Sequence, residues 1–579
     1  MTQHLISVAR GRASADLLLK NARIVNVYTG EVESGNVTIS AGLIAGVGDY
    51  RDATRVIDLG GAYLAPGFID GHVHLESSML GVGQYARAVV PHGTQAIVTD
   101  LHEIANVAGV DGLRNVLDAA RGLPLDVFLM APSCVPATNL ETSGAVLNVE
   151  SLRRLLRWKR CIGLGEMMNF PAVLNADPEV LAKIMLESGR AVDGHAPGLT
   201  GKDLNAYVTA GIHSDHESVT LAEAREKLSL GMHVMIREGS SEKNLEALLP
   251  LVTDRTYQRC MFVVDDRTCV DLLNDGDLDA VLRKAITLGL DPVRAIQMVT
   301  INPARYFRLQ RLGAVAPGYV ANLLVLDDLR DVTVRSVFHQ GSLVADRGHA
   351  VFSVKKATPS GLGHTVNVKP FDRHAFTALA PSDRTHVRIH IIEIVPGQII
   401  TRKTTAEVEI AGGAVKPDPT RDLLKAVVVE RHRGTGNIGI GFVRGFGLKR
   451  GALASSISHD SHNIVAVGVD DASIQTAVKE IARLQGGLVA AEGPQVLAAL
   501  PLPVAGLLSE MSLEDTVQNL AHLERVASRL GTTLSSPFSP LSFLALPVIP
   551  ELRLTDLGLV DVNQFRIIPL SAEDPVTDH

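Results

Sequence analysis

Short apolar runs recur through the middle of the chain at intervals of roughly 25 to 35 residues, with amphipathic helical patterns between them. This alternation is typical of repeated β-α units, in which a buried parallel strand is followed by a helix. Eight such runs occupy about 240 residues, which is the size of a (β/α)8 barrel. The predicted strands are Phe68–His74, Gln95–His102, Asp126–Ala131, Cys161–Glu166, Ala191–His195, Gly211–His216, His233–Arg237 and Met261–Asp265. The predicted helices include Gly109–Arg121, Val149–Arg160, Pro178–Ser188, Leu221–Leu228 and Leu278–Leu288.

The chain on either side of this region follows a different pattern, in which apolar and polar residues alternate as in strands with one solvated face. We expect residues 1–65 and 315–350 to form one small β-sandwich domain that is discontinuous in sequence, with the barrel over 66–314. Residues 351–370 are weakly patterned and predict a linker. Residues 371–579 predict a C-terminal α+β domain. The predicted fold class is therefore α/β, a TIM-like (β/α)8 barrel with two added domains.

The amino-acid composition limits the kinds of molecule that this protein can bind. Of 579 residues, 46% are hydrophobic and 20% are charged, and the formal net charge is −8. An acidic chain argues against a nucleic-acid track, and no apolar run approaches the roughly 20 residues needed to span a bilayer. The four cysteines include no C-x-x-C pair, so neither a disulfide framework nor a cysteine zinc site is indicated. Residues 1–12 show no secretory signal, so we expect a cytoplasmic protein that acts on a small molecule.

Side chains that bind metals or transfer protons follow nearly every predicted barrel strand. His72 and His74 alternate with Val73, so both imidazoles face the same side of an extended strand, where they can grip one divalent cation. The other strand ends carry Asp100, His102, Glu103, Glu166, His195, Asp215, His216, Glu217, Arg237, Glu238, Asp265, Asp266 and Arg267. Because the carboxyl ends of barrel strands meet at one mouth, we expect a metal site and a polar substrate pocket there.

Taken together, these segments resemble the amidohydrolase superfamily and, within it, the adenine deaminase family. The likeness is carried by residues 65–76, 100–106, 165–169, 193–197, 214–217, 236–240 and 264–267, and by 445–447 and 458–463 in the C-terminal domain. The resemblance implies two divalent metal ions, with Mn²⁺ favoured over Fe²⁺ or Zn²⁺. It implies that one ion is held by His72, His74 and Asp265. It implies that the other is held by Glu166, His195 and His216, with Glu166 able to bridge the two.

The same resemblance implies hydrolysis of adenine to hypoxanthine and ammonia, in purine salvage or catabolism. Asp265 would take the proton of the attacking water and pass it to the leaving amine. Purine N1 must also be protonated, and either Glu166 or Glu103 would supply that proton. A homodimer is the expected assembly.

Substrate recognition is expected at the same mouth, and the predicted substrate-binding residues are His102, Glu103, Arg237 and Glu238. A salt bridge that supports the rim is the alternative role for Arg237 and Glu238. A C-terminal loop that carries His459, Asp460 and His462 either reaches over the barrel or is solvated.

Two other functions compete with deamination. A cyclic-amide hydrolase of the dihydroorotase or hydantoinase type favours a carboxylated lysine on strand four, where this chain has Glu166. A non-catalytic barrel scaffold tends to lose its ligand histidines, and all six candidate ligands are present here. Ammonia release from adenine, ring opening of hydantoins and the content of bound metal distinguish the three functions.

Overall fold

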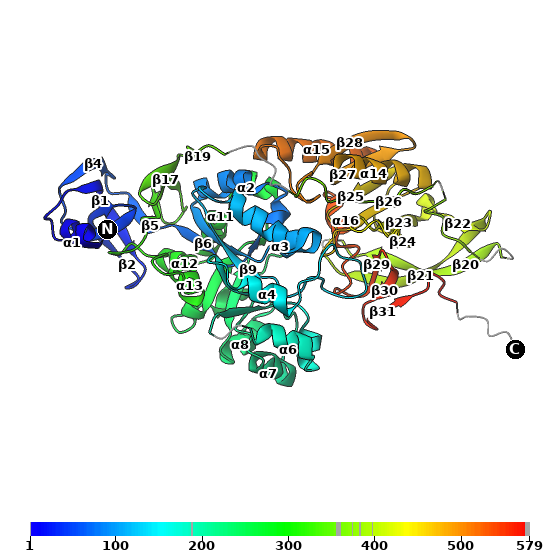
Figure 1. Ribbon diagram of the computed structural model, residues 1–579, viewed down its shortest axis with the longest axis horizontal. Coiled ribbons are helices and arrows are strands. Elements are labelled where there is room, and N and C mark those ends of the chain that lie inside the picture. The colour runs from blue at the N-terminus through cyan, green and yellow to red at the C-terminus, as the bar shows by residue number, and fades with distance from the viewer. Residues whose placement is uncertain are drawn as a thin grey trace.

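The computed structural model describes residues 2–186, 189–354, 361–372, 374–380, 384–396 and 398–573. The N-terminal strands lie at one end of the molecule, the barrel lies in the middle and the C-terminal domain lies at the other end (Figure 1). Residues 355–360 of the predicted linker and 187–188 of the predicted Pro178–Ser188 helix lie outside the described residues. Among the residues that are described, none of the helices has the length and hydropathy required to cross a bilayer.

The central region is a closed barrel of short parallel strands. One group runs in the order β11 (Ala191–Gly194), β10 (Cys161–Met167), β9 (Asp126–Ala131), β8 (Thr94–Thr99) and β6 (Phe68–Asp70). A second group contains β12 (Ser214–Asp215), β13 (His233–Arg237) and β14 (Cys260–Val263), and β15 (Asp265–Asp266) pairs with β7 (Val73–His74). Hydrogen bonds from His213 N to Val192 O and from Asp265 N to His72 O join these groups around the cylinder. The chain therefore contains a TIM-like (β/α)8 barrel.

Helices around the strands explain why the strand sequences are continuously apolar. All six residues of β8 are buried, because the barrel interior covers one face and helices cover the other. The helices include α3 (His102–Ala119), α4 (Val149–Leu155), α6 (Pro178–Ile184), α8 (Leu221–Ser229) and α11 (Leu278–Thr287) (Figure 1). The α8 helix begins after Thr220, whose side chain accepts a hydrogen bond from Glu223 N.

The predicted boundary after the second barrel strand is wrong. The strand was expected to run to His102, but β8 ends at Thr99 and His102 is the first residue of α3. Leu101 between them adopts a left-handed backbone conformation with φ of 53°, which turns the chain from strand to helix. His102 and Glu103 therefore lie on the first helical turn, where consecutive side chains diverge by about 100° rather than alternating across a strand.

Strands from both ends of the barrel region meet in one sheet. The order is β19 (His349–Ala350), β18 (Ser342–Asp346), β17 (Val334–His339), β16 (Leu323–Leu326), β5 (Tyr63–Pro66), β1 (Ala15–Asn26), β2 (Glu31–Ser40) and β3 (Leu43–Gly48), with β4 (Ala53–Asp58) paired to β1. β5 and β16 are antiparallel partners, with Leu64 opposite Val325. Strands from both sides of the barrel region therefore lie in one sheet, and a separate cluster of buried side chains forms its core.

The C-terminal domain is built on a second large sheet. Its order is β22 (Ala414–Val415), β21 (Thr401–Ala411), β20 (His386–Ile394), β24 (Ile438–Arg444), β23 (Leu424–Val429), β26 (Ile464–Gly468), β25 (Ala452–Ser455), β27 (Gly487–Glu492) and β28 (Gln495–Pro501). Helix α14 (Asp471–Leu484) packs Ile474, Val478 and Ile481 into the core of this domain. Helices α15 (Leu513–Arg529) and α16 (Phe538–Phe543) follow, and then a small sheet of β29 (Leu552–Thr555), β30 (Gly558–Asp561) and β31 (Arg566–Ile568).

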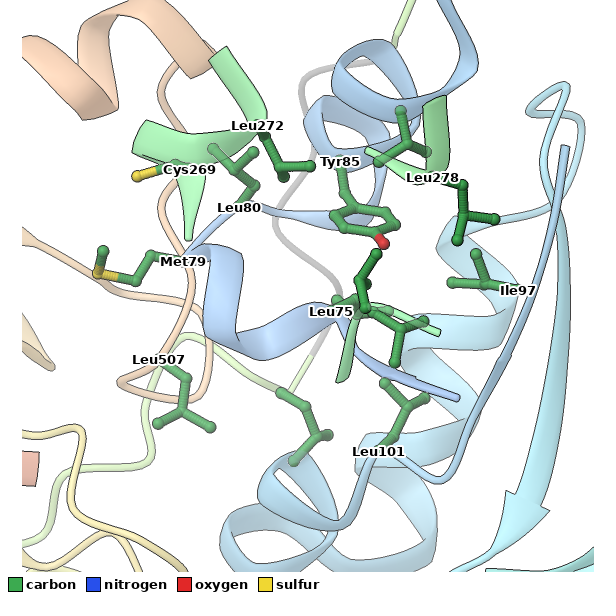
Figure 2. Close-up of a cluster of buried hydrophobic side chains, with 14 of the residues drawn as sticks. Leu75, Met79, Leu80, Tyr85, Ile97, Leu101, Cys269, Leu272, Leu278 and Leu507 are labelled. Atoms are coloured by element: carbon green, nitrogen blue, oxygen red, sulfur yellow. The ribbon is translucent and has the colours of Figure 1, made fainter. Parts of the chain in front are cut away.

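The barrel and the C-terminal domain share a buried apolar cluster. Figure 2 shows Leu507 of the C-terminal domain beside Met79, which follows the first barrel strand. Both side chains are at most 7% exposed. Backbone hydrogen bonds reinforce the contact, from Ser509 N to Met79 O at 2.7 Å and from Gly81 N to Ser509 O at 3.1 Å. Because apolar burial and backbone bonds coincide here, the C-terminal domain is fixed against the barrel mouth.

Candidate active site

Two strands at the seam of the barrel bring the first group of polar side chains together. β7 and β15 are parallel neighbours, and this pairing places His72 and His74 beside Asp265. Asp265 Oδ1 lies 3.4 Å from His72 Nε2 and 3.3 Å from His74 Nε2. All three residues are at most 6% exposed. The predicted orientation of both histidines toward one site is therefore present, although the strand is interrupted between Asp70 and Val73.

Glu166, at the end of β10, connects this group to a second one. Its Oε1 is 3.0 Å from His74 Nε2 and 3.5 Å from His72 Nε2. Its Oε2 is 2.8 Å from His195 Nδ1 and 3.6 Å from His216 Nε2. One carboxylate oxygen thus faces each pair of histidines. The structure brings all six predicted ligands to one place, with Glu166 between the two halves.

This donor set fits divalent metal ions. His72 Nε2 and Glu166 Oε1 are buried and have no hydrogen-bond partner among the described residues. Leaving buried polar atoms unpaired is costly, so such atoms usually have a partner. Ligand atoms of His72, His216 and Asp265 lie within 4.8 Å of one another, as do those of Glu166, His195 and His216. Imidazole and carboxylate donors in this number suit zinc, manganese or iron.

Asp265 is also held from its other side by Arg237. Arg237 Nη1 donates to Asp265 Oδ2 at 3.0 Å, and Arg237 Nη2 donates to Glu217 Oε2 at 3.0 Å. Its Nε donates to Asn244 Oδ1 at 2.9 Å. Burial opposes the charged form of Asp265, but its close contacts with His72 and His74 and the charge of Arg237 together hold its pKa well below the usual range. Arg237 therefore keeps the carboxylate ionised and oriented.

Asp100, which follows β8, links the histidines to helix α3. Its Oδ1 lies 3.4 Å from His74 Nδ1 and 3.0 Å from His102 Nδ1. A carboxylate behind a metal-binding imidazole fixes the tautomer and the orientation of the ring. His102 Nε2 lies 3.4 Å from Glu103 Oε1, so the same chain of contacts continues to Glu103. His102 and Glu103 thus line the edge of the six-residue cluster.

Glu238 is not brought to the cluster. Its Oε1 accepts a hydrogen bond from Lys284 Nζ at 2.5 Å, and its Oε2 accepts one from Leu245 N at 3.2 Å. The expected alternative, a rim salt bridge between Arg237 and Glu238, is wrong in its partners, because Arg237 pairs with Glu217 and Asp265 instead. Glu238 supports the start of helix α9 (Leu245–Leu248) and the neighbouring helix α11.

A buried lysine network supports the ends of β11 and β12, and sequence reasoning missed it. Lys227 Nζ donates to Asp215 Oδ2, Glu223 Oε1 and Ala196 O, each at 2.8 Å. Asp215 also accepts from Ala196 N at 3.0 Å. These bonds fix the segments that carry His195 and His216. The available signal was the spacing of Glu223 and Lys227, four residues apart on a helix, which looks like an ordinary surface ion pair.

The C-terminal loop reaches the barrel mouth rather than solvent. His459 Nδ1 lies 2.6 Å from Glu103 Oε1, and His462 Nε2 contacts Glu103 Oε2. Asp460 Oδ1 is 4.0 Å from His102 Nε2. Of the two alternatives for this loop, the structure supports the one in which it covers the barrel.

Two family models match the chain. The model of the amidohydrolase family matches residues 63–344, and that of the adenine deaminase C-terminal domain matches residues 398–566. An adenine deaminase of Dehalococcoides mccartyi (strain ATCC BAA-2266 / KCTC 15142 / 195) is 58% identical over 98% of each chain. Adenine deaminase 2 of Carboxydothermus hydrogenoformans is 48% identical over 98% of this chain and 99% of its own. An adenine deaminase of Methanothrix thermoacetophila is 47% identical over 99% and 100%.

Proposed function

The chain belongs to the adenine deaminase family and converts adenine to hypoxanthine and ammonia, and we propose that the buried cluster around Glu166 carries this reaction. The observation that supports the proposal is the convergence of six histidine and carboxylate side chains at the barrel mouth, with Glu166 between two sets of donors. The substrate is a small purine. No separate observation favours a cyclic-amide hydrolase or a scaffold, since Glu166 stands at the position where those hydrolases favour lysine.

We assign two divalent ions to this cluster, with Mn²⁺ as the expected metal. One ion would be held by His72, His74 and Asp265, and the other by His195 and His216, with Glu166 shared between them. A divalent ion in such a site supplies Lewis acidity, which lowers the pKa of bound water and makes a nucleophile available near neutral pH. The unpartnered buried atoms of His72 and Glu166 support this assignment.

Asp265 is the proposed general base. Its carboxylate is buried, ionised and held at 3.0 Å by Arg237, so one oxygen remains directed toward the cluster. It would accept the proton of the attacking water and deliver that proton to the leaving amine. The proton for N1 would come from either Glu166 or Glu103; both carboxylates contact histidines through both of their oxygens, so these contacts do not distinguish them. A homodimer, a cytoplasmic location and a role in purine salvage stay predictions.

The test is ammonia release from adenine with Mn²⁺ present, measured beside metal content. We expect the wild-type protein to release ammonia, to lose activity on chelation and to regain it with Mn²⁺. Asp265→Asn should lower the rate by at least about 100-fold, the typical contribution of a positioned base, and His72→Asn should lower both the rate and the metal content because it removes a ligand. His213→Asn is the matched control, since this exposed histidine precedes β12 and lies outside the cluster. A wild-type protein that retains metal but releases no ammonia from adenine would refute the proposal.

A further inference from the structure

Two histidines of the C-terminal domain occupy both oxygens of one barrel carboxylate. They lie on the loop between β25 and β26, and the carboxylate is Glu103 on the first turn of α3. His459 Nδ1 lies 2.6 Å from Glu103 Oε1, and His462 Nε2 contacts Glu103 Oε2. The side chains of Glu103 and His462 are 4% and 1% exposed. A buried carboxylate with two imidazole partners is fixed in position and direction.

The protonation of His462 follows from its second ring nitrogen. His462 Nδ1 accepts a hydrogen bond from Ser458 N at 3.1 Å, so the ring proton is on Nε2. Nε2 therefore faces Glu103 as a donor and not as a metal ligand, and neither Nε2 nor Oε2 has another hydrogen-bond partner in the described chain. The His459, His462 and Glu103 group is thus held together by the hydrogen bond between His459 Nδ1 and Glu103 Oε1 and by the contact of His462 Nε2 with Glu103 Oε2.

Both domains hold the loop in place. Buried Arg431 donates through Nε to His462 O and through Nη2 to Ala505 O at 3.0 Å. Asn463 Nδ2 donates to Thr142 O, on a barrel loop, at 2.8 Å. The ring of His459 stacks on Phe543 of α16, with 4.5 Å between ring centroids. Because the loop is fixed from three directions, its histidines are preorganised to hold Glu103 before substrate binds.

The carboxylate held in this way faces a cavity between the domains. This cavity has a volume of about 390 Å³ and is lined by Glu76, Glu103, Asp266, His459, His462 and Phe543, among other residues. Apolar side chains, among them Met79, Leu507 and Phe543, line it beside these polar groups, and such a combination is typical of small-molecule sites. A purine offers ring N–H donors, and a carboxylate held ready to accept matches them. Glu103 contacts His102, His102 contacts Asp100, and Asp100 contacts His74. The cavity therefore lies next to the cluster.

We propose that His459 and His462 are positioning residues that hold Glu103 as the hydrogen-bond acceptor for a ring N–H of the purine, so that the C-terminal domain completes the substrate site. The proposal rests on adenine deamination as the function. It gives the C-terminal domain a role in the reaction of the barrel, through contacts that a barrel alone could not make. Neither histidine touches the reacting atoms, and both act through Glu103.

The test is a double-mutant cycle in the full-length, Mn²⁺-loaded enzyme. We expect His459→Leu and His462→Leu each to lower kcat/KM for adenine by about 10- to 100-fold, the usual effect of losing a residue that orients a site group, with most of the change in KM. Glu103→Ala should lose at least as much. In the Glu103→Ala background, either leucine substitution should cause less than about a twofold further loss, because the histidines no longer have a group to position. His386→Leu, an exposed histidine of the same domain, is the matched control and should match wild type.

Two measurements distinguish a positioning role of the histidines from a role in folding: the activity recovered by a conservative variant, and the metal content of each variant. His462→Gln keeps an N–H donor near Glu103 and should recover part of the activity lost in His462→Leu. Two metal ions per chain should be retained in each variant. Additive losses in the cycle, or losses that follow metal content, would overturn the proposal. If a leucine variant does not fold, the cycle uses His462→Gln and Glu103→Gln instead. Full activity in one of these two variants would also overturn the proposal. A wild-type enzyme inactive on adenine would instead refute the proposed function.

Discussion

Lys227 is fully buried, and its removal tests how the barrel holds His195 and His216. Its ammonium has three acceptors at 2.8 Å, two of them the carboxylates of Asp215 and Glu223. Lys227→Met keeps the volume but leaves both carboxylates without a cation. Breaking a buried ion pair from one side costs about 3–5 kcal/mol. Backbone donors still reach both carboxylates, from Ala196 N at 3.0 Å and Gly198 N at 2.8 Å, so we expect a loss within that range.

Urea unfolding followed by circular dichroism measures this loss, with metal content determined on the same samples. Lys20→Met is the control, because the Lys20 and Asp58 side chains are 41% and 47% exposed and such pairs contribute about 0–1 kcal/mol. Adding Glu223→Gln to Lys227→Met removes one of the two stranded charges, so the double variant should be less destabilised than the sum of the single variants. If Lys227→Met and Lys20→Met shift the midpoint equally, the reasoning about the buried charge is refuted.

Two further predictions concern other buried charges. Arg237→Lys should lower kcat for adenine by about 10- to 100-fold with metal content unchanged, because one ammonium cannot replace the guanidinium fork on Asp265 and Glu217; unaltered kinetics would contradict this. His92 contacts Asp279 at 3.1 Å; burial opposes its charged form, but this carboxylate raises its pKa overall. The contact of protonated His92 with Asp279 stabilises the fold fully below the unfolded pKa of His92, about 6.5. This stabilisation is lost as the pH rises through the raised pKa of His92 in the folded protein. Urea midpoints should therefore fall over that window in wild type, and a His92→Gln variant with an equal fall would contradict the assignment.

The barrel could be predicted because its strands are covered on both faces. β9 and β13 begin and end at the predicted residues, since each is a continuous apolar run with clear breaks around it. Boundaries failed where polar function replaced the apolar pattern. The second strand was extended to His102 because nothing in the sequence marks the left-handed turn at Leu101. The start of α14 is also ambiguous in the sequence, because either Asp470 or Asp471 can cap the helix, and the structure uses Asp470.

The candidate site, like the barrel, could be predicted from the sequence only in part. Residues that end successive strands must meet, because barrel closure forces the strand ends into one ring, and this rule alone brings Glu166 beside His74 and His195. The rule says nothing about side chains that arrive from helices or from other domains. It therefore placed Arg237 and Glu238 together at the rim, whereas Arg237 turns toward Asp265 and Glu238 toward Lys284. The direction in which a side chain points at the end of a strand depends on the local backbone geometry. The spacing of the strands in the sequence does not determine this geometry.

The contact between Glu103 and the C-terminal domain could not be predicted from the sequence. Its partner His459 is 356 positions away in sequence, in a domain whose sheet has its own core. No spacing rule links them, because the contact depends on how two independently patterned domains dock through Met79, Leu507 and Ser509. The docking places the loop that carries His459, Asp460 and His462 over the barrel mouth, where unpaired polar groups would be costly. The contacts of His459 and His462 with Glu103 help to offset this cost, so the interface that joins the domains also shapes the pocket.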